Sequence, residues 1–196
     1  MKMIKRALAL GIIFASGAAQ ANMSATLDIA TTITGGTCKV SVSNGGLIVL
    51  DTIRTDALDG IQPEDNAPGG VPFTLTVDSC DIDTQTPGDG TLHIAFMPQS
   101  GAFVGDTLQV FPSTLTADQN GAENIGFVVF TDPPQGNGVN VQKPGGAGSR
   151  VEQQVNKAEL LHSRYPFYVR YQKVTASAPV QAGLLFSQAL IEVSYD

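Results

Sequence analysis

Alternation of apolar and polar residues is the strongest pattern in this chain, and it is clearest at the C-terminal end. Every second residue there is apolar or small: Leu185, Ser187, Ala189, Ile191, Val193 and Tyr195. A period of two residues predicts a β-strand with one buried face. The chain stops at Asp196, so we expect another polypeptide to pair with the free edge of this last strand.

The same alternation occurs near the other end of the chain. Its apolar and Thr positions are Met23, Ala25, Leu27, Ile29, Thr31 and Ile33, and the residues between them are small or polar. Chain termini usually fray unless they are tied down. The pattern therefore predicts a second terminal strand that needs a partner.

Further short alternating or apolar segments lie between these two ends. We predict strands at 39–42, 47–50, 73–77, 92–96, 107–111, 125–131, 139–141 and 167–171. The near-continuous apolar run 125–131 is typical of a strand buried on both faces. Only 151–161 has helical character, so the sequence predicts an all-β protein with two packed antiparallel sheets, an immunoglobulin-like sandwich.

The first 21 residues have the features of a secretory signal peptide. Lys2, Lys5 and Arg6 precede the apolar stretch 7–15, and Ala19-Gln20-Ala21 forms a small-residue cleavage site. We exclude residues 1–21 from the fold on this basis. A membrane anchor is the less favoured alternative, because the apolar stretch is short for a bilayer span.

The charge of the remaining 175 residues argues against two classes of partner. Without Lys2, Lys5 and Arg6, the 11 Lys and Arg residues become 8, against 18 Asp and Glu, so the net charge is −10. No basic patch is apparent, so nucleic acid and anionic membranes are not expected partners. Membrane insertion is not expected either, because no other run is long and apolar enough.

The two cysteines, Cys38 and Cys80, predict one disulfide, because an even and minimal count in an exported protein is typical of a pair. Closing a loop of this length contributes about 4 kcal/mol in the chain-entropy model. Two free buried thiols are the alternative. A metal site would need more ligands than these two residues supply.

The sequence offers little for an enzyme. His93 and His162 lie in a strand and in a polar segment, and no common catalytic motif is present. The acidic residues around Cys80 (Asp78, Asp81, Asp83 and Asp89) fit a solvated loop better than a calcium site. We therefore predict no enzymatic activity, no cofactor and no metal.

An aromatic cluster remains as a candidate binding site: Tyr165, Phe167, Tyr168 and Tyr171. These rings could form a platform that stacks on sugars, as in a secreted lectin-like sandwich. The favoured interpretation is that the rings pack in the core of a strand and against residues of neighbouring strands.

Neither terminal strand carries a Pro or Lys, the residues that usually protect a free strand edge. An unprotected edge is a template on which another chain can add a strand. Strand addition is therefore the function that the sequence favours.

Several segments, taken in order behind a signal peptide, resemble one known family. They are 73–77 (FTLTV) ahead of Cys80, 92–96 (LHIAF), 124–132 (NIGFVVFTD) and 166–171 (PFYVRY), together with Gly183, the fourteenth residue from the C-terminus, and the penultimate Tyr195. The spacing of Cys38 and Cys80 also matches. Over essentially the whole exported chain, the sequence resembles the type 1-like subunits of the chaperone–usher pili (fimbriae) of Gram-negative bacteria.

The resemblance implies a sandwich that lacks its seventh strand and is completed by a donor strand from elsewhere. A periplasmic chaperone first fills the groove, and the N-terminal extension of a neighbouring pilin replaces it at an outer-membrane usher. The expected pairing edge consists of Gly183, Leu185, Ser187, Ala189, Ile191, Val193 and Tyr195. The expected donor residues are Met23, Ala25, Leu27 and Ile29.

The implied organisation is a signal peptide at 1–21, a donor extension at 22–28 and a pilin domain at 29–196. The extension is short, because only sixteen residues precede Cys38 in the exported chain. The implied role is a structural subunit exported through the periplasm into a surface fimbrium that supports cell adhesion. A minor or tip-adaptor pilin is an alternative role, whereas the length leaves no room for the second domain of a tip adhesin.

Overall fold

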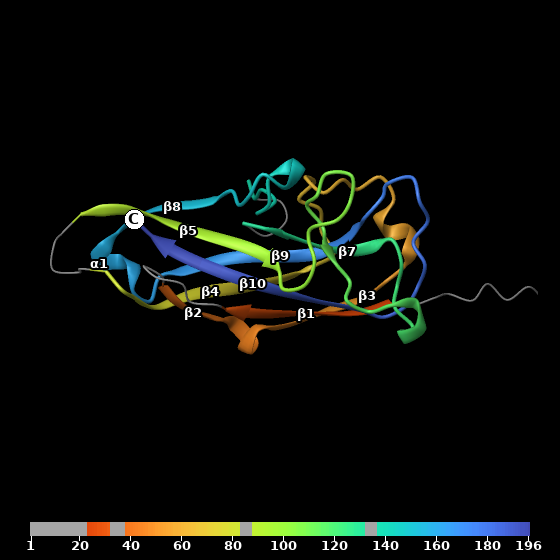
Figure 1. Ribbon diagram of the computed structural model, residues 1–196, viewed down its shortest axis with the longest axis horizontal. Helices are drawn as coiled ribbons and strands as arrows, with labels where there is room; N and C mark the ends of the chain where they lie inside the picture. Colours follow the sequence, from red (N-terminus) through yellow and green to blue (C-terminus); the bar gives the residue numbers. More distant parts are fainter. Residues whose placement is uncertain (1–22, 32–37, 83–87, 132–136) are drawn as a thin grey trace, which may run out of the picture.

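The computed structural model describes residues 23–31, 38–82, 88–131 and 137–196. Within these ranges the chain forms two five-stranded β-sheets that pack face to face (Figure 1). The first sheet has the order β3-β1-β10-β5-β8 and the second the order β2-β4-β9-β7-β6. The all-β sandwich predicted from the sequence is therefore confirmed.

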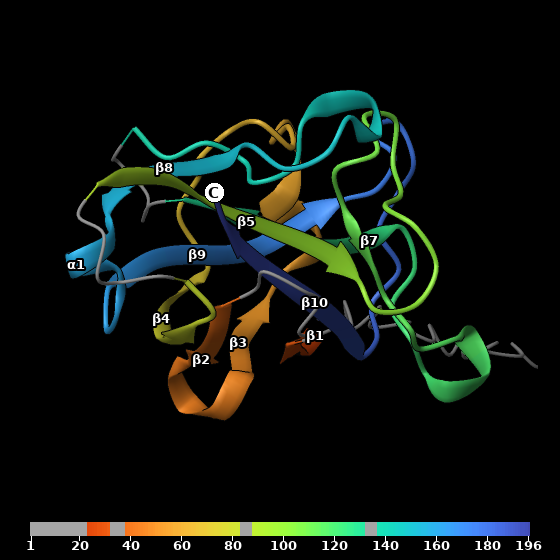
Figure 2. The ribbon, with the colours of Figure 1, turned by 60° about the vertical axis from the view of Figure 1, so that its left-hand side comes forward.

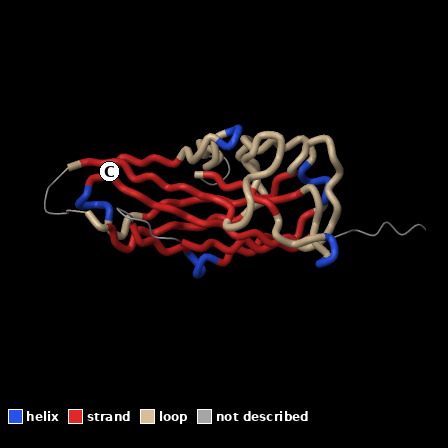
Figure 3. The backbone as a smooth tube through the Cα atoms, in the orientation of Figure 1, coloured by secondary structure: helices blue, strands red, loops and turns tan. Residues whose placement is uncertain are grey.

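The strands of the first sheet are β1 (Met23–Thr31), β3 (Leu47–Ile53), β5 (Asp89–Pro98), β8 (Val151–Asn156) and β10 (Leu185–Tyr195). Those of the second sheet are β2 (Cys38–Val42), β4 (Val71–Cys80), β6 (Phe111–Pro112), β7 (Ile125–Phe130) and β9 (Arg164–Lys173). A single α-helical turn, α1 (Lys157–Leu160), and the 3₁₀ turns η1 (Ser43–Gly46), η2 (Thr55–Leu58), η3 (Ala117–Gln119) and η4 (Pro144–Gly146) complete the described elements. Loops gather at the end of the molecule away from the C-terminus (Figure 3).

The hydrophobic patterning predicted the burial of the two most distinctive strands. In β10 the burial alternates without interruption from Leu185 to Tyr195, with every odd-numbered residue buried. In β7 all six residues are buried, which confirms the prediction from its continuous apolar run. One face of β7 meets the core between the sheets, and Val128 and Phe130 on the other face form a second small cluster with Tyr168.

The strand beside β10 comes from the same chain. β1 lies between β3 and β10, so β10 is an interior strand of its sheet rather than an open edge (Figure 2). An unfilled strand position next to β10 is accordingly not seen in the described residues.

The prediction of helical character for 151–161 is wrong for most of that segment. Val151–Asn156 forms strand β8, which pairs antiparallel with β5 at the edge of the sheet. Val151 packs into the core, whereas Glu152, Gln153 and Gln154 are exposed. Helix remains only in α1, where the Asn156 side chain accepts a hydrogen bond from the Ala158 N–H at 3.0 Å.

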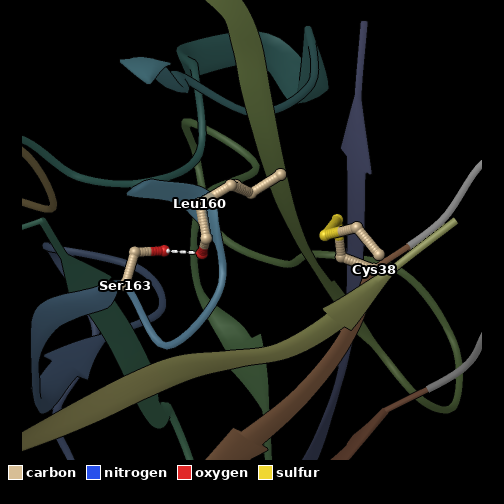
Figure 4. Close-up of a disulfide and its surroundings, with 4 residues drawn as sticks. Cys38, Leu160 and Ser163 are labelled. Atoms are coloured by element: carbon tan, nitrogen blue, oxygen red, sulfur yellow. Dashed lines mark hydrogen bonds between the residues drawn. A yellow bond between two sulfur atoms is a disulfide. The ribbon is translucent and has the colours of Figure 1, made fainter. Parts of the chain in front are cut away.

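The predicted disulfide between Cys38 and Cys80 is present and joins β2 to β4 within the second sheet. Leu160 and Ser163 lie in the turn beside it, where the Ser163 hydroxyl donates to the Leu160 carbonyl (Figure 4). Cys38, Cys80 and Leu160 belong to one hydrophobic cluster. The disulfide therefore closes one end of the core.

The predicted signal peptide lies outside the described residues. Among the residues that are described, no helix has the length and apolar character needed to cross a membrane.

Candidate functional site: the position filled by β1

β1 is held in the sheet by two different pairings. It runs parallel to β10, from Ala25 opposite Leu185 to Thr31 opposite Ile191. It runs antiparallel to β3, with Met23 opposite Ile53 and Asp28 opposite Leu47. We call the position between β3 and β10 the β1 slot.

Three β1 side chains enter the core between the sheets. Ala25, Leu27 and Ile29 are 3%, 0% and 6% exposed. The structure thus places these three residues, which were predicted as donors to a neighbouring copy, against β10 of their own chain. Met23 begins the same strand, and the strand is continuous across the predicted boundary at residues 28 and 29.

The sizes of the paired side chains are complementary. Small Ala25 lies level with Leu185, Leu27 with small Ser187, and Ile29 with small Ala189. Large residues on one strand therefore meet small residues on the other, which allows dense packing at each level. Ser187 is buried although it is polar, and its small size suits its place beside Leu27.

A polar contact on the outer face of the sheet supports the same register. The Gln188 side-chain amide donates to the Asp28 carboxylate at 3.1 Å, and the two residues are direct partners in the β1–β10 ladder. A shift by one residue would separate them and would also turn the apolar face of β1 outward.

The link to β2 accounts for the parallel orientation. The seven Cα–Cα steps from Thr31 to Cys38 can span at most about 25 Å. Cys38 pairs with Cys80 at the end of β4. The same end of the second sheet, where Arg164 pairs with Thr76, is connected through α1 to the end of β8, where Asn156 pairs with Asp89. Tyr195 lies at that end of β10, opposite Leu92. An antiparallel β1 would end near Leu185, about 33 Å away along β10, beyond the reach of this link.

The remaining residues of the predicted edge extend past β1 at both ends. Val193 and Tyr195 lie beyond Thr31 and pair with β5. The Tyr195 hydroxyl donates to the Val155 carbonyl at 2.9 Å, and its ring lies over Gly90. The backbone of Asp196 exchanges two hydrogen bonds with Thr91, so the end of the chain is fixed in the sheet.

Gly183 precedes the strand and has a packing role. A Cβ atom at this position would lie 2.6 Å from the backbone nitrogen of Ala122 and 2.6 Å from the carbonyl oxygen of Asn120. The segment 120–122 approaches this closely because Leu184 exchanges backbone hydrogen bonds with Asn120 and Ala122, both at 2.8 Å. A side chain cannot fit between them.

Sequence reasoning missed a buried arginine on the outer face of the second sheet. Arg170 is 1% exposed and donates to the carbonyls of Gln62 and Asp65 at 2.9 Å and 2.5 Å. Its guanidinium also lies 5.2 Å from the centre of the Phe130 ring. Burial lowers the pKa of Arg170 to about 10. The residue anchors the polar segment 54–70 over β7 and β9. An Arg within an otherwise apolar strand is the sequence signal that could have pointed to this buried site.

The aromatic cluster proves to be mostly interior. Phe167, Tyr168 and Tyr171 are each 2% exposed or less, so they cannot form a stacking platform on the surface. The Tyr171 hydroxyl donates to the Asp51 carbonyl at 3.0 Å. Burial, with a smaller contribution from the charge of Asp51, raises the pKa of Tyr171 to about 12.

Among the candidate chemical residues, His93 contacts a carboxylate. His93 lies on the outer face of β5 and is 3.2 Å from the carboxylate of Asp196. Within the described ranges, no three His, Cys, Asp or Glu side chains come together in a group that could hold a metal ion. The strand pairing of β1 and β10 is therefore the arrangement on which a functional interpretation can rest.

Comparison with known proteins gives two matches. The family model described as "Fimbrial protein" matches residues 16–196, a range that includes both β1 and β10. The uncharacterized fimbrial-like protein YadK of Escherichia coli (strain K12) is 32% identical over 173 residues, which cover 87% of this chain and 84% of that relative.

Proposed function

Because this chain belongs to the fimbrial protein family and is a pilus subunit, we propose that it polymerises head-to-tail by donor-strand exchange. In this proposal β1 of one copy leaves its own slot and enters the β1 slot of the next copy. A donor and a slot on different surfaces make a contact that does not close, and such a contact produces a filament.

The observation that carries the proposal is the fit of β1 to its slot. β1 is a terminal strand that completes the core through Leu27 and Ile29, whose full burial contributes roughly 3 to 6 kcal/mol. It is held by strand pairing, packing and the Gln188–Asp28 hydrogen bond, and the disulfide lies in β2 and β4. The slot can therefore accept β1 of another copy through contacts of the same kinds.

The proposal includes a specific register. A donor from another copy is free of the short link to Cys38 of the receiving chain, so it can enter antiparallel to β10, a pairing that is slightly more stable per residue. With Leu27 opposite Ala189, Ala25 falls opposite Ile191 and Ile29 opposite Ser187. Each large residue again meets a small one, so the packing of the slot is retained.

Cysteine pairs on the outer face distinguish the two arrangements. Thr26 lies opposite Phe186 within one chain, whereas the proposed exchange places it opposite Leu190 of the next copy. Thr26→Cys with Leu190→Cys should cross-link copies in assembled pili, and Thr26→Cys with Phe186→Cys should cross-link only within monomers. The reverse result would exclude this register.

A deletion tests the exchange itself. Cells that express the chain without residues 22–28 should lose the ladder of high-mass species in unboiled SDS samples. Leu27→Asp should have the same effect, because the side chain is fully buried, and Thr26→Asp on the half-buried outer face is the matched control. An unchanged ladder after the deletion would refute donor-strand exchange.

We further propose that a periplasmic chaperone occupies the β1 slot before assembly and that an outer-membrane usher receives the complex. Ile191 is fully buried and faces the slot, so Ile191→Asp should prevent accumulation of the subunit in the periplasm. Ser194→Asp, on the outer face of the same strand, should accumulate normally. Equal accumulation of both variants would contradict the chaperone step.

The proposed role is structural rather than catalytic. As a surface filament, the assembled subunits would support cell adhesion by extending from the cell, with neighbouring copies or related pilins as their partners.

A further inference from the structure

We propose that a cleft between β8 and the beginning of β9 binds a sugar that carries a carboxylate group. The cleft has a volume of about 470 Å³, within the usual range for small-ligand sites. The residues on which the argument rests are Thr131, Arg150, Gln153, Arg164, Tyr165 and Pro166. None of them belongs to β1, β3 or β10, so this site is separate from the proposed polymerisation site.

The cleft exists because β7 is too short to pair with the first residues of β9. β7 pairs with β9 only from Phe130 opposite Tyr168 onward. In the part of the chain that the structure describes, Arg164–Phe167 therefore pair with β4 alone. β8, at the edge of the other sheet, forms the opposite wall with Gln153.

A positive side chain in the cleft contrasts with the acidic character of the molecule. Residues 22–196 have a net charge of −10, yet Arg150 and Arg164 line this cleft and no Asp or Glu is among its described lining residues. Arg150 forms a salt bridge with the Glu64 carboxylate, at 2.8 Å and 3.0 Å, which neutralises its charge, so the positive charge offered to a ligand comes from Arg164. Arg164 has no ion pair with any residue that the structure describes, so its charge is available to a carboxylate.

The other walls suit a sugar ring. Tyr165 is half-buried and Pro166 is exposed, so a ring face and an apolar edge lie next to the arginine. The Gln153 amide and the Thr131 hydroxyl supply polar groups that can reach sugar hydroxyls. A few polar groups around an apolar surface are the usual composition of a small-ligand site.

A peptide strand is the less suitable occupant, although strand edges border the cleft. Pro166 lies in the middle of the short exposed stretch of β9 and has no N–H to donate. Proline in an edge strand is one of the devices that prevent strand addition. The chemistry of the cleft therefore favours an acidic sugar over a peptide.

Titration of the folded, ¹⁵N-labelled exported chain tests the proposal. Sodium glucuronate and sodium N-acetylneuraminate represent two sources of the carboxylate, and glucose and sodium acetate are the matched probes that lack one of the two features. We expect saturable shifts of the Thr131, Gln153 and Tyr165 amides with at least one acidic sugar, in the millimolar range, and weaker responses to glucose and acetate.

Charge variants complete the test. Arg164→Ala should lower the affinity for the acidic sugar at least about tenfold, as expected for loss of a hydrogen bond between charged groups. Lys157→Ala removes the same charge from outside the cleft and should leave the affinity unchanged. No saturation with either acidic sugar, an equal response to acetate or glucose, or full affinity in Arg164→Ala would each overturn the proposal.

Discussion

Replacement of Gly183 by alanine gives the most direct test of how β10 is placed. The added Cβ would lie 2.6 to 2.7 Å from three backbone atoms of residues 120–122. Backbone atoms cannot rotate aside as a flexible side chain can, so the two segments must separate. Separation would lengthen the two 2.8 Å hydrogen bonds that Leu184 makes with Asn120 and Ala122.

The expected cost follows from these contacts. Overpacking at a close contact typically costs about 1 to 3 kcal/mol, and each weakened hydrogen bond adds up to about 1 kcal/mol. The lower conformational entropy of the unfolded alanine variant returns about 0.4 to 1 kcal/mol. We therefore expect Gly183→Ala to lower the free energy of unfolding by about 2 to 4 kcal/mol.

Urea unfolding of residues 22–196 with the disulfide intact measures this change. With an m-value of about 2 kcal/mol/M, the midpoint should fall by about 1 to 2 M. Gly88→Ala is the matched control, because a Cβ there meets no atom within 4 Å, and its midpoint should be unchanged or slightly raised. A midpoint for Gly183→Ala within error of that of the control would show that the reasoning about residues 120–122 is wrong.

Three further outcomes follow from the structure. Leu27→Ala should lower the free energy of unfolding by about 2 to 5 kcal/mol, because the side chain is fully buried. Thr26→Ala, on the outer face, should change the free energy of unfolding by less than about 0.5 kcal/mol. The urea midpoints of the two variants measure this difference. Reduction of the Cys38–Cys80 disulfide should cost about 2 to 5 kcal/mol, seen as a lower midpoint with dithiothreitol, and an unchanged midpoint would contradict this. The pKa of Tyr171 is raised from 10.0 to about 12 in the folded state, so the stability contributed by the neutral phenol is complete below pH 10 and is lost as the pH rises through 12. Between these pH values Tyr171→Phe should therefore lose less free energy of unfolding than the unchanged chain. Identical dependence of stability on pH in the two proteins would refute this prediction.

The sequence was sufficient to predict elements whose burial follows their own local pattern. In β10 the alternation of side chains translates directly into alternate burial, and in β7 the unbroken apolar run corresponds to burial on both faces. The disulfide could be predicted as well, because a chain with two cysteines has a single possible intramolecular pairing.

Features that depend on distant segments could not be predicted in this way. The Glu and Gln residues of β8 favour a helix locally, but pairing with β5 and burial of Val151 decide in favour of a strand. Arg170 reads as a surface residue until segment 54–70 covers it and supplies its carbonyl acceptors. The close approach that requires a glycine at position 183 involves a segment about sixty residues earlier.

The side-chain sizes on the inner face of β10 explain how one strand can serve both within a chain and between chains. Small Ser187 and Ala189 are flanked by large Leu185 and Ile191, so the sequence of sizes reads nearly the same in both directions about Gln188. A donor that presents a small residue followed by two large ones, as Ala25, Leu27 and Ile29 do, fits this face whether it runs parallel or antiparallel. The short link to Cys38 selects the parallel fit within a chain, and a donor from another copy, which lacks this constraint, can take the antiparallel fit under the proposed exchange.

Ala189→Leu would remove the symmetry by filling one of the two small positions, and it should therefore impair both the closed monomer and the proposed filament, whereas a change at Gln188 on the outer face should spare the packing of both.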